Sequence, residues 1–331
     1  MAIHIGRREF IVTLGGAVVA WPRDTLAQTS TKVYRLGVLD PVRPLGATSP
    51  DATALLGALA ERGYTLGRNL AYDARASGGD ISKLPDLLND FKASGVDVIV
   101  TIGYPATLAA QTAGVPTVVA WGVSDPVATG LVKSLAQPGG TVTGISENAT
   151  ILSTKRLSLL RELLPKLRRV AMLWNTEDLG MALRYETSAA AARSIGIAVQ
   201  PLGVRAPDDF TRAFEIMDRE PPDAILMMSD TLTVLNRKRV FDYTAAKRLP
   251  AMYESEPYVR GGGLMSYGAD RKESFQRAAA LVDRIFKGTK PADLPFEQPT
   301  RYLFMINLGI AKAMGLEIPP NLLALADEVI E

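Results

Sequence analysis

Residues 96–121 read VDVIVTIGYPATLAAQTAGVPTVVAW. Residues 96–102 and 115–121 are rich in β-branched and bulky apolar side chains, a composition typical of strands buried on both faces of a sheet. Between them, Gly103-Tyr104-Pro105 opens a helical segment, because proline favours the first turn of a helix. The stretch therefore predicts a strand–helix–strand unit with parallel strands and a right-handed crossover.

The same rhythm continues in both directions along the chain. Further strand-like runs occur at residues 36–39, 170–174, 224–228 and 264–267. In residues 274–287, apolar side chains recur at helical spacing along one face, and residues 155–164 show the same pattern. Well over a dozen elements are too many for one core. The sequence therefore predicts an α/β protein of two doubly wound parallel-sheet domains.

The N-terminal residues have the composition of an export signal. Arg7-Arg8 precedes an uncharged stretch over residues 11–22, and Thr25-Leu26-Ala27 ends it with small residues suited to cleavage. The stretch is shorter than the roughly 20 apolar residues of a membrane span. Paired arginines resemble a twin-arginine signal, although the general secretory route stays open. We expect a signal peptide over residues 1–27 and a periplasmic mature protein.

Composition excludes several classes of function. The 331 residues contain no cysteine and one histidine, His4, which lies in the expected signal. The mature chain would therefore lack Ser-His-Asp triads, Cys-His pairs and the usual zinc ligands. The net charge of +2 and the lack of a basic run argue against a nucleic-acid partner. We expect no metal and no cofactor.

Many short segments also follow the order of a known family. They are ERGY (61–64), GRN (67–69), VDVIVT (96–101), PAT (105–107), DPV (125–127), LVKSLAQPGG (131–140), GGGLMSYG (261–268), KPADLP (290–295) and QPT (298–300). On these segments the chain resembles the ABC-importer substrate-binding proteins that include the tryptophan- and tyrosine-binding members. The resemblance spans residues 32–331.

That resemblance implies the type I periplasmic-binding-protein fold, with three hinge crossings and a ligand cleft between the domains. It implies a first domain of residues 32–145 and 268–290 and a second of 146–267 and 291–331. The expected crossings lie near Gly144-Ile145, Tyr267-Gly268 and residues 291–302. The implied partners are a small-molecule ligand and, transiently, a membrane permease, with the protein itself a monomer.

Candidate ligand-binding residues follow from the rule that open parallel sheets bind ligands beyond the carboxyl ends of their strands. They are Arg43, Gly103, Tyr104, Pro105, Trp121, Ser124, Trp174, Asn175, Ser229, Asp230, Tyr253 and Tyr267. The helix start after Gly103 would attract a ligand carboxylate. Tyr104 departs from the small hydroxyl residue usual in the family. The aromatic residues suit a planar ligand, although each also suits a core position.

Two acidic positions have a structural alternative. Asp125 followed by Pro126 favours the cap of a helix leading to Leu135, which leaves Ser124 as the better ligand contact. Asp230 suits a helix cap and a ligand ammonium equally. Asp230 and Glu254 are also the nearest approach to the carboxylate pair of a glycosidase.

The preferred reading is therefore a non-catalytic binding protein for an aromatic amino acid or aromatic acid, with branched aliphatic amino or carboxylic acids next. An exported sensor that docks on a membrane receptor, or a carboxylate-dependent enzyme, remains an alternative because a fold does not fix a function.

Overall fold

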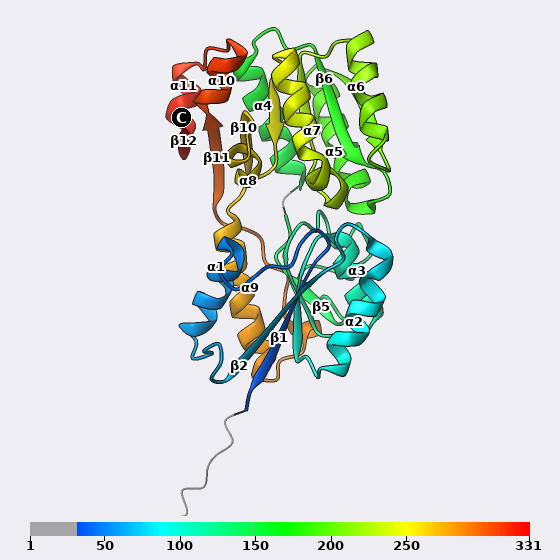
Figure 1. The fold of residues 1–331 in the computed structure, drawn as a ribbon, viewed down its shortest axis with the longest axis vertical. Coiled ribbons are helices and arrows are strands. Elements are labelled where there is room, and N and C mark those ends of the chain that lie inside the picture. The colour runs from blue at the N-terminus through cyan, green and yellow to red at the C-terminus, as the bar shows by residue number, and fades with distance from the viewer. Residues whose placement is uncertain (1–31, 148) are drawn as a thin grey trace, which may run out of the picture. The chain divides into compact units, whose positions relative to one another are not determined.

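The computed structural model describes residues 32–147 and 149–331. The export signal expected over residues 1–27, with its twin arginines and cleavage position, lies outside the described residues. Val33 to Glu331 form one compact unit. This unit contains two sheets, and we refer to each sheet with its helices as a lobe (Figure 1).

The first sheet has five parallel strands in the order β2-β1-β3-β4-β5. Their bounds are β1 (Tyr34–Asp40), β2 (Leu70–Ala76), β3 (Val98–Ile102), β4 (Thr117–Trp121) and β5 (Val142–Gly144). The central strands β3 and β4 are almost entirely buried, as their apolar composition predicts. All strands are parallel, so their carboxyl ends share one edge of the sheet.

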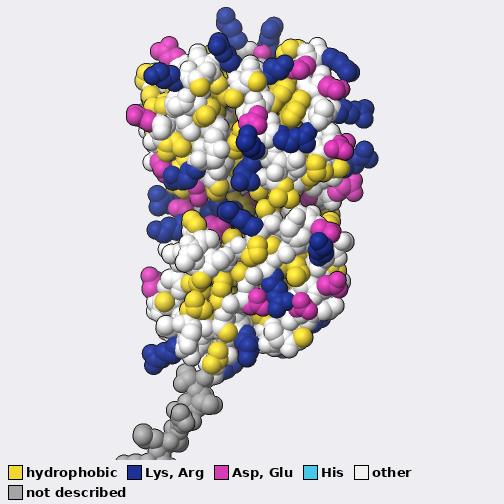
Figure 2. Space-filling view, viewed as in Figure 1, with side chains coloured by type: hydrophobic (Ala, Val, Ile, Leu, Met, Phe, Trp, Pro, Cys, Tyr) yellow, Lys and Arg dark blue, Asp and Glu magenta, His cyan; other side chains and the backbone are white. Residues whose placement is uncertain are grey.

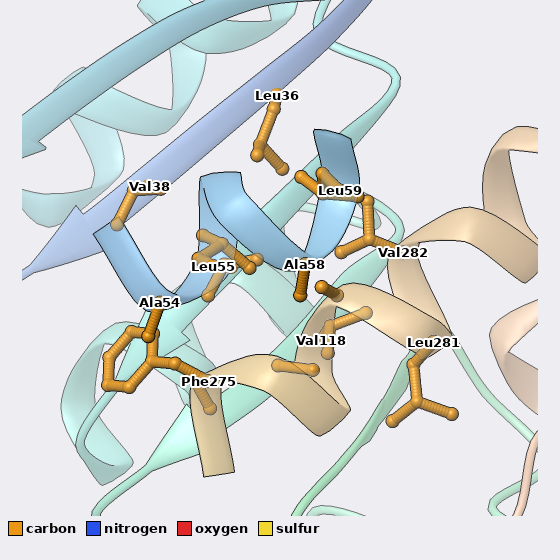
Figure 3. Packing of buried hydrophobic residues seen from close by; sticks show 14 of the residues in the cluster. Leu36, Val38, Ala54, Leu55, Ala58, Leu59, Val118, Phe275, Leu281 and Val282 are labelled. Carbon is orange, nitrogen blue, oxygen red and sulfur yellow. The ribbon is translucent and has the colours of Figure 1, made fainter. Parts of the chain in front are cut away.

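Helices cover both faces of the first sheet (Figure 1). They are α1 (Pro50–Ala60), α2 (Leu84–Ala93), α3 (Tyr104–Thr112) and α9 (Arg271–Phe286), with a short 3-10 turn η1 (Ile81–Lys83) before α2. Helices α1 and α9 lie together on one face, and Figure 3 shows Leu55, Leu59 and Val282 among their interleaved side chains. Phe91 and Ala106 belong to the core on the opposite face.

The second sheet has seven strands in the order β12-β11-β10-β9-β8-β6-β7. Their bounds are β6 (Arg169–Asn175), β7 (Ala198–Val204), β8 (Ala224–Met227), β9 (Ala251–Tyr253), β10 (Met265–Ala269), β11 (Tyr302–Asn307) and β12 (Glu328–Ile330). Only β10 and β11 pair antiparallel. The predicted doubly wound fold class is thus confirmed, with one antiparallel strand pair in a mainly parallel sheet.

The second lobe also carries helices on both faces. They are α4 (Ala149–Leu163), α5 (Leu179–Ser194), α6 (Asp209–Arg219), α7 (Thr231–Lys247), α8 (Glu256–Arg260), α10 (Leu308–Met314) and α11 (Pro320–Leu325). One core includes Leu157, Met172 and Phe304, and the core of the other face includes Phe210 and Tyr253.

The chain passes between the lobes three times. It leaves the first lobe after β5, returns from β10 into α9, and crosses again before β11. Before this last crossing, the 3-10 turn η2 (Pro291–Asp293) and Leu294 still pack on the first lobe. The hydroxyl of Thr143 in β5 donates to the Leu294 carbonyl oxygen at 2.7 Å.

One local prediction was wrong. The residues directly after Asp125, 126–130, form turns and not the expected helix. The Asp125 carboxylate does accept hydrogen bonds from the backbone N–H groups of Val127 and Ala128. However, Gly130 has a φ of 76°, which takes the backbone out of the helical region after a single turn.

Candidate ligand-binding cleft

A cavity of about 270 Å³ lies between loops of the two lobes. Its lining residues come mainly from the carboxyl ends of β1, β3, β4, β8 and β9, as the strand-end rule predicts. Five of the predicted site residues line it: Arg43, Gly103, Trp121, Ser229 and Asp230. The cavity lies near the lower limit of the volumes typical of small-molecule sites.

Trp121 forms an aromatic wall on the first lobe, and Arg271 fixes its surroundings. Arg271 begins α9 and bonds the Asp51 carboxylate on α1, with Nη2 to Oδ2 at 2.5 Å. Its guanidinium lies 4.7 Å from the Trp121 ring centroid and 5.6 Å from that of Phe275. Although Arg271 is buried, the Asp51 carboxylate raises its pKa against the lowering effect of burial. The arginine therefore stays charged beside the cavity.

The start of α3 forms the adjoining part of this wall. Gly103 precedes the helix with a φ of 81°, and its N–H donates to the Trp121 carbonyl oxygen at 2.8 Å. Gly122 has a φ of 80°, and a Cβ there would lie 3.1 Å from the Gly103 backbone. Both positions therefore favour glycine, which lets the two strand ends approach each other closely.

Asp230 dominates the second-lobe wall. It caps α7: its Oδ1 accepts from the Thr233 N–H at 2.7 Å, and the Thr233 hydroxyl accepts from the Asp230 N–H at 2.9 Å. Burial raises the pKa of Asp230 to about 7, opposed by the hydrogen bond from the Thr233 N–H and reinforced by the Asp178 carboxylate. Capping is thus established, and it uses one of the two carboxylate oxygens.

Three polar atoms of this wall are buried yet make no hydrogen bond within the described residues: Ser229 Oγ, Asp230 Oδ2 and the Tyr258 hydroxyl. All three residues line the cavity. Burial raises the pKa of Tyr258, opposed by the neighbouring Ser229 hydroxyl and reinforced by the charges of Asp230 and Glu254, so its hydroxyl stays protonated. Because buried polar atoms in proteins are normally paired, this group of acceptors is suited to a ligand that supplies donors. We call these three residues the acceptor cradle.

The other predicted first-lobe residues lie beside the cavity rather than along it. Tyr104 packs with Val119 and Val123 and is nearly buried. Pro105 occupies the first turn of α3. Ser124 accepts a hydrogen bond from the Arg184 Nε of the second lobe at 3.3 Å.

The remaining second-lobe candidates also lie outside the cavity lining. The Trp174 ring stacks on Tyr185, with centroids 3.6 Å apart. The Asn175 side chain accepts from the Glu177 N–H. Tyr253 is fully buried and stacks behind Tyr258, and Tyr267 lies near Tyr302 with ring centroids 6.2 Å apart. The aromatic residue that lines the cavity in this lobe is Tyr258, which lies in α8, five residues beyond Tyr253.

Sequence reasoning did not single out several lining residues, among them Asp51, Tyr258 and Arg271. Asp51 and Arg271 are 220 residues apart, and no sequence pattern links them. Tyr258 lies in α8, five residues after the candidate Tyr253 that ends β9.

The described residues offer little for other classes of site. Among them, no group of three or more acidic, histidine or cysteine side chains converges as a metal site requires. Within residues 32–147 and 149–331 no helix has both the length and the apolar character to cross a membrane. On the face shown in Figure 2, basic and acidic side chains are interspersed.

Two doubly wound lobes, three crossings and a cleft between strand ends define the type I periplasmic-binding-protein fold. The family model for ABC transporter substrate binding proteins matches residues 48–330, and the chain belongs to this family. The resemblance seen in the sequence is thus confirmed.

Individual relatives agree with this assignment. A tyrosine-binding protein of Clostridioides difficile is 26% identical over 262 residues, covering 78% of this chain and 75% of that protein. The ABC domain of a Streptococcus pneumoniae protein, solved in complex with L-Trp, has a TM-score of 0.82 at 26% identity, covering 90% of this chain and all of that one. A conserved domain protein of Vibrio cholerae has the same TM-score and coverage at 25% identity.

Proposed function

We propose that this protein binds an aromatic amino acid in the cleft and delivers it, unchanged, to the permease of an ABC importer. The proposal includes export to the periplasm and a monomeric protein without cofactor. The family assignment supports the transport role. The tyrosine-binding relative and the tryptophan-bound neighbour support the choice of ligand class.

The observation that carries the proposal is the acceptor cradle beside Trp121. A primary ammonium group has three N–H donors, and the cradle offers three oxygen acceptors, one of them on a carboxylate. Trp121 supplies a flat apolar surface for a ring. An ammonium and an aromatic ring on one small molecule match both features.

The first lobe supports a third contact. The N-terminus of α3 follows Gly103 at the cavity, and its free N–H groups favour a carboxylate. Arg43 lines the same cavity and adds positive charge. These features favour an amino acid over an aromatic acid that lacks an amine, because the acid would leave the Asp230 carboxylate buried and unpaired.

We also propose that the two lobes move as domains about the three crossings. The first two boundaries are those expected at residues 145 and 267. We assign the third crossing to residues 298–301, within the expected range of 291–302, and move the domain boundary from residue 290 to 297, because Leu294 and Phe296 pack on the first lobe. The Glu297 N–H also donates to the Gly144 carbonyl oxygen at 2.8 Å.

The test is isothermal titration calorimetry of the purified mature protein with four probes. L-Tryptophan should bind, whereas indole-3-propionate, which lacks the ammonium, and tryptamine, which lacks the carboxylate, should bind at least tenfold more weakly. L-Leucine tests the aliphatic alternative. Mass spectrometry of the released ligand should recover it unchanged. Tight binding of leucine alone, or conversion of the ligand to a product, would contradict the proposal.

A further inference from the structure

Four charged side chains form a buried cluster beneath the acceptor cradle. Arg184 of α5 donates from Nη1 to Glu254 Oε2 at 2.6 Å and from Nη2 to Glu147. Arg156 of α4 donates from Nη1 to Glu254 Oε1 at 2.7 Å. All four side chains are at least 94% buried. A buried cluster of this kind is costly to assemble and holds its members in fixed positions once formed.

Glu254 also holds the cradle. The same Oε2 that accepts from Arg184 accepts from the Ser229 N–H at 2.8 Å. Ser229 and its neighbour Asp230 supply two of the three cradle acceptors. A shift of the Glu254 carboxylate would therefore move the backbone that presents those acceptors to the cavity.

The cluster reaches the crossings and the first lobe as well. Glu147 lies just after the first crossing, and Arg156 Nε donates to the carbonyl oxygen of Tyr267 at the second. The remaining donor of Arg184, Nε, reaches Ser124 Oγ on the first lobe at 3.3 Å. Arg184 is thus bonded to Glu254, which holds the cradle, to Glu147 beside the first crossing, and to Ser124 on the first lobe.

A close approach of the two lobes makes the contact with Ser124 possible. Gly180 lies one turn before Arg184 on α5, and a Cβ there would lie 3.1 Å from Asp178 Oδ1, 3.6 Å from the Tyr104 Cβ and 3.7 Å from the Ser124 Cβ. The space between the lobes is therefore already filled at this point, and even a methyl group would be tight against Asp178. A long side chain at position 180 would hold the lobes apart.

We propose that Arg184 is a positioning residue that couples occupancy of the acceptor cradle to closure of the lobes through its bond to Ser124. This inference rests on the proposed function. Separation of the lobes breaks the bond to Ser124, whereas the bonds to Glu254 and Glu147 stay within the second lobe and the crossing. A ligand that bonds the cradle and also contacts Trp121 on the first lobe favours the closed arrangement, in which Arg184 meets Ser124, so bound ligand and closed lobes stabilise each other.

The test removes the acceptor on the first lobe with Ser124→Ala. The chain has no cysteine, so Lys92→Cys and Glu215→Cys, both on exposed helices of different lobes, give specific positions for a pair of distance labels. The control is Ser153→Ala, which deletes a buried hydroxyl bonded to Ser188 within the second lobe. Ser124→Thr keeps the hydroxyl and should restore wild-type behaviour.

In the protein without ligand, Ser124→Ala should lengthen the mean distance between the labels and Ser153→Ala should not. With L-tryptophan, Ser124→Ala should raise the dissociation rate about tenfold and leave the association rate nearly unchanged, as expected for the loss of one hydrogen bond to a charged group. Gly180→Leu replaces a poor helix former by a good one, and its side chain should produce the same separation by steric means.

The outcomes separate the two proposals. If wild-type protein fails to bind L-tryptophan, the proposed ligand is wrong, and an unchanged label distance in ligand-free Ser124→Ala would still refute the coupling separately. If Ser124→Ala weakens binding while the distance without ligand stays unchanged, Ser124 contacts the ligand directly and the coupling is refuted. Equal behaviour of the Ser124→Ala and Ser153→Ala proteins also refutes it.

Discussion

Replacing Asp230 by asparagine separates the two tasks of this side chain. Asparagine caps helices as well as aspartate does, so its side-chain oxygen can still accept from the Thr233 N–H. What the substitution removes is the charge on the second oxygen, which is buried and makes no hydrogen bond within the described residues. Stability and binding should therefore change in opposite directions.

The change in stability follows from the pKa of Asp230, which is raised to about 7 in the folded protein. In the unfolded chain an aspartate has a pKa near 3.9, so the folded state binds the proton more tightly. The free energy of unfolding therefore decreases as the pH rises from about 4 to 7, by about 4 kcal/mol in total. About 2.5 kcal/mol of this loss falls between pH 5 and pH 8.

The Asp230→Asn protein has no ionisable group at this position, so its free energy of unfolding does not decrease in this way as the pH rises. At pH 8 its free energy of unfolding should exceed that of the wild type by about 1–3 kcal/mol, because burial of an unpaired amide offsets part of the gain. Urea denaturation of the ligand-free proteins at pH 5 and pH 8 measures the loss of stability in the wild type and the difference between the two proteins at pH 8. Asp125→Asn, the same exchange at an exposed turn, is the matched control.

Binding should respond in the opposite sense. A ligand ammonium pairs with the ionised carboxylate, so ligand must displace a proton below pH 7. Wild-type affinity for L-tryptophan should therefore fall about a hundredfold from pH 8 to pH 5. Burial, the Asp178 carboxylate and the hydrogen bonds from Thr233 set the pKa of this carboxylate, and the cationic side chains that line the same cavity are Arg43, Arg237 and Arg271.

Asp230→Asn should bind L-tryptophan about ten- to a hundredfold more weakly at pH 8, with little further change at pH 5. Calorimetry at both pH values gives the comparison. The reasoning is refuted if the wild type binds equally well at pH 5 and pH 8, or if the asparagine variant binds as tightly as the wild type.

Four further substitutions or measurements test other parts of the molecule. Tyr258→Phe should weaken L-tryptophan binding about tenfold while the melting temperature stays near that of the wild type, and unchanged affinity would exclude its hydroxyl from the cradle. Arg271→Ala should lower the free energy of unfolding by about 2–4 kcal/mol, because it leaves Asp51 largely buried without its partner; a loss below 1 kcal/mol in urea would contradict this role. Phe275→Ala should cost about 3–5 kcal/mol of stability, with the affinity of the remaining folded protein unchanged in calorimetry. N-terminal sequencing of exported protein should find a start near Gln28, whereas a start at Met1 would argue against signal cleavage.

The sequence predicted the buried strands well and the edge strands poorly, for one physical reason. Strands β3, β4, β6 and β8 are covered on both faces, so selection for burial leaves continuous apolar runs. Strands β2 and β7 lie at the sheet edges and are only partly buried, and their sequences LAYDARA and AVQPLGV carry charged or polar residues and a proline. Proline is tolerated at an edge, where one side of the strand has no neighbour to bond.

The site was only partly predictable because two kinds of information are needed. The strand-end rule selects loops from local sequence, and it led to Arg43, Gly103, Trp121, Ser229 and Asp230, which line the cavity. It does not say which residue of a loop faces the cavity. That choice depends on contacts between distant segments, such as the pair of Arg271 with Asp51 or of Arg184 with Glu254.

Asp230 shows why the sequence left capping and ligand binding equally open. A residue that ends a buried strand and begins a helix meets both demands at once, because the cleft and the helix N-terminus coincide there. A carboxylate has two oxygens, and in this structure they are divided: one closes the capping box, and the other is buried without a hydrogen-bond partner among the described residues. Serine or threonine would cap the same helix with a single oxygen. The second oxygen is therefore unnecessary for the helix and costly to bury, and the cationic ligand group that we propose would give it a partner.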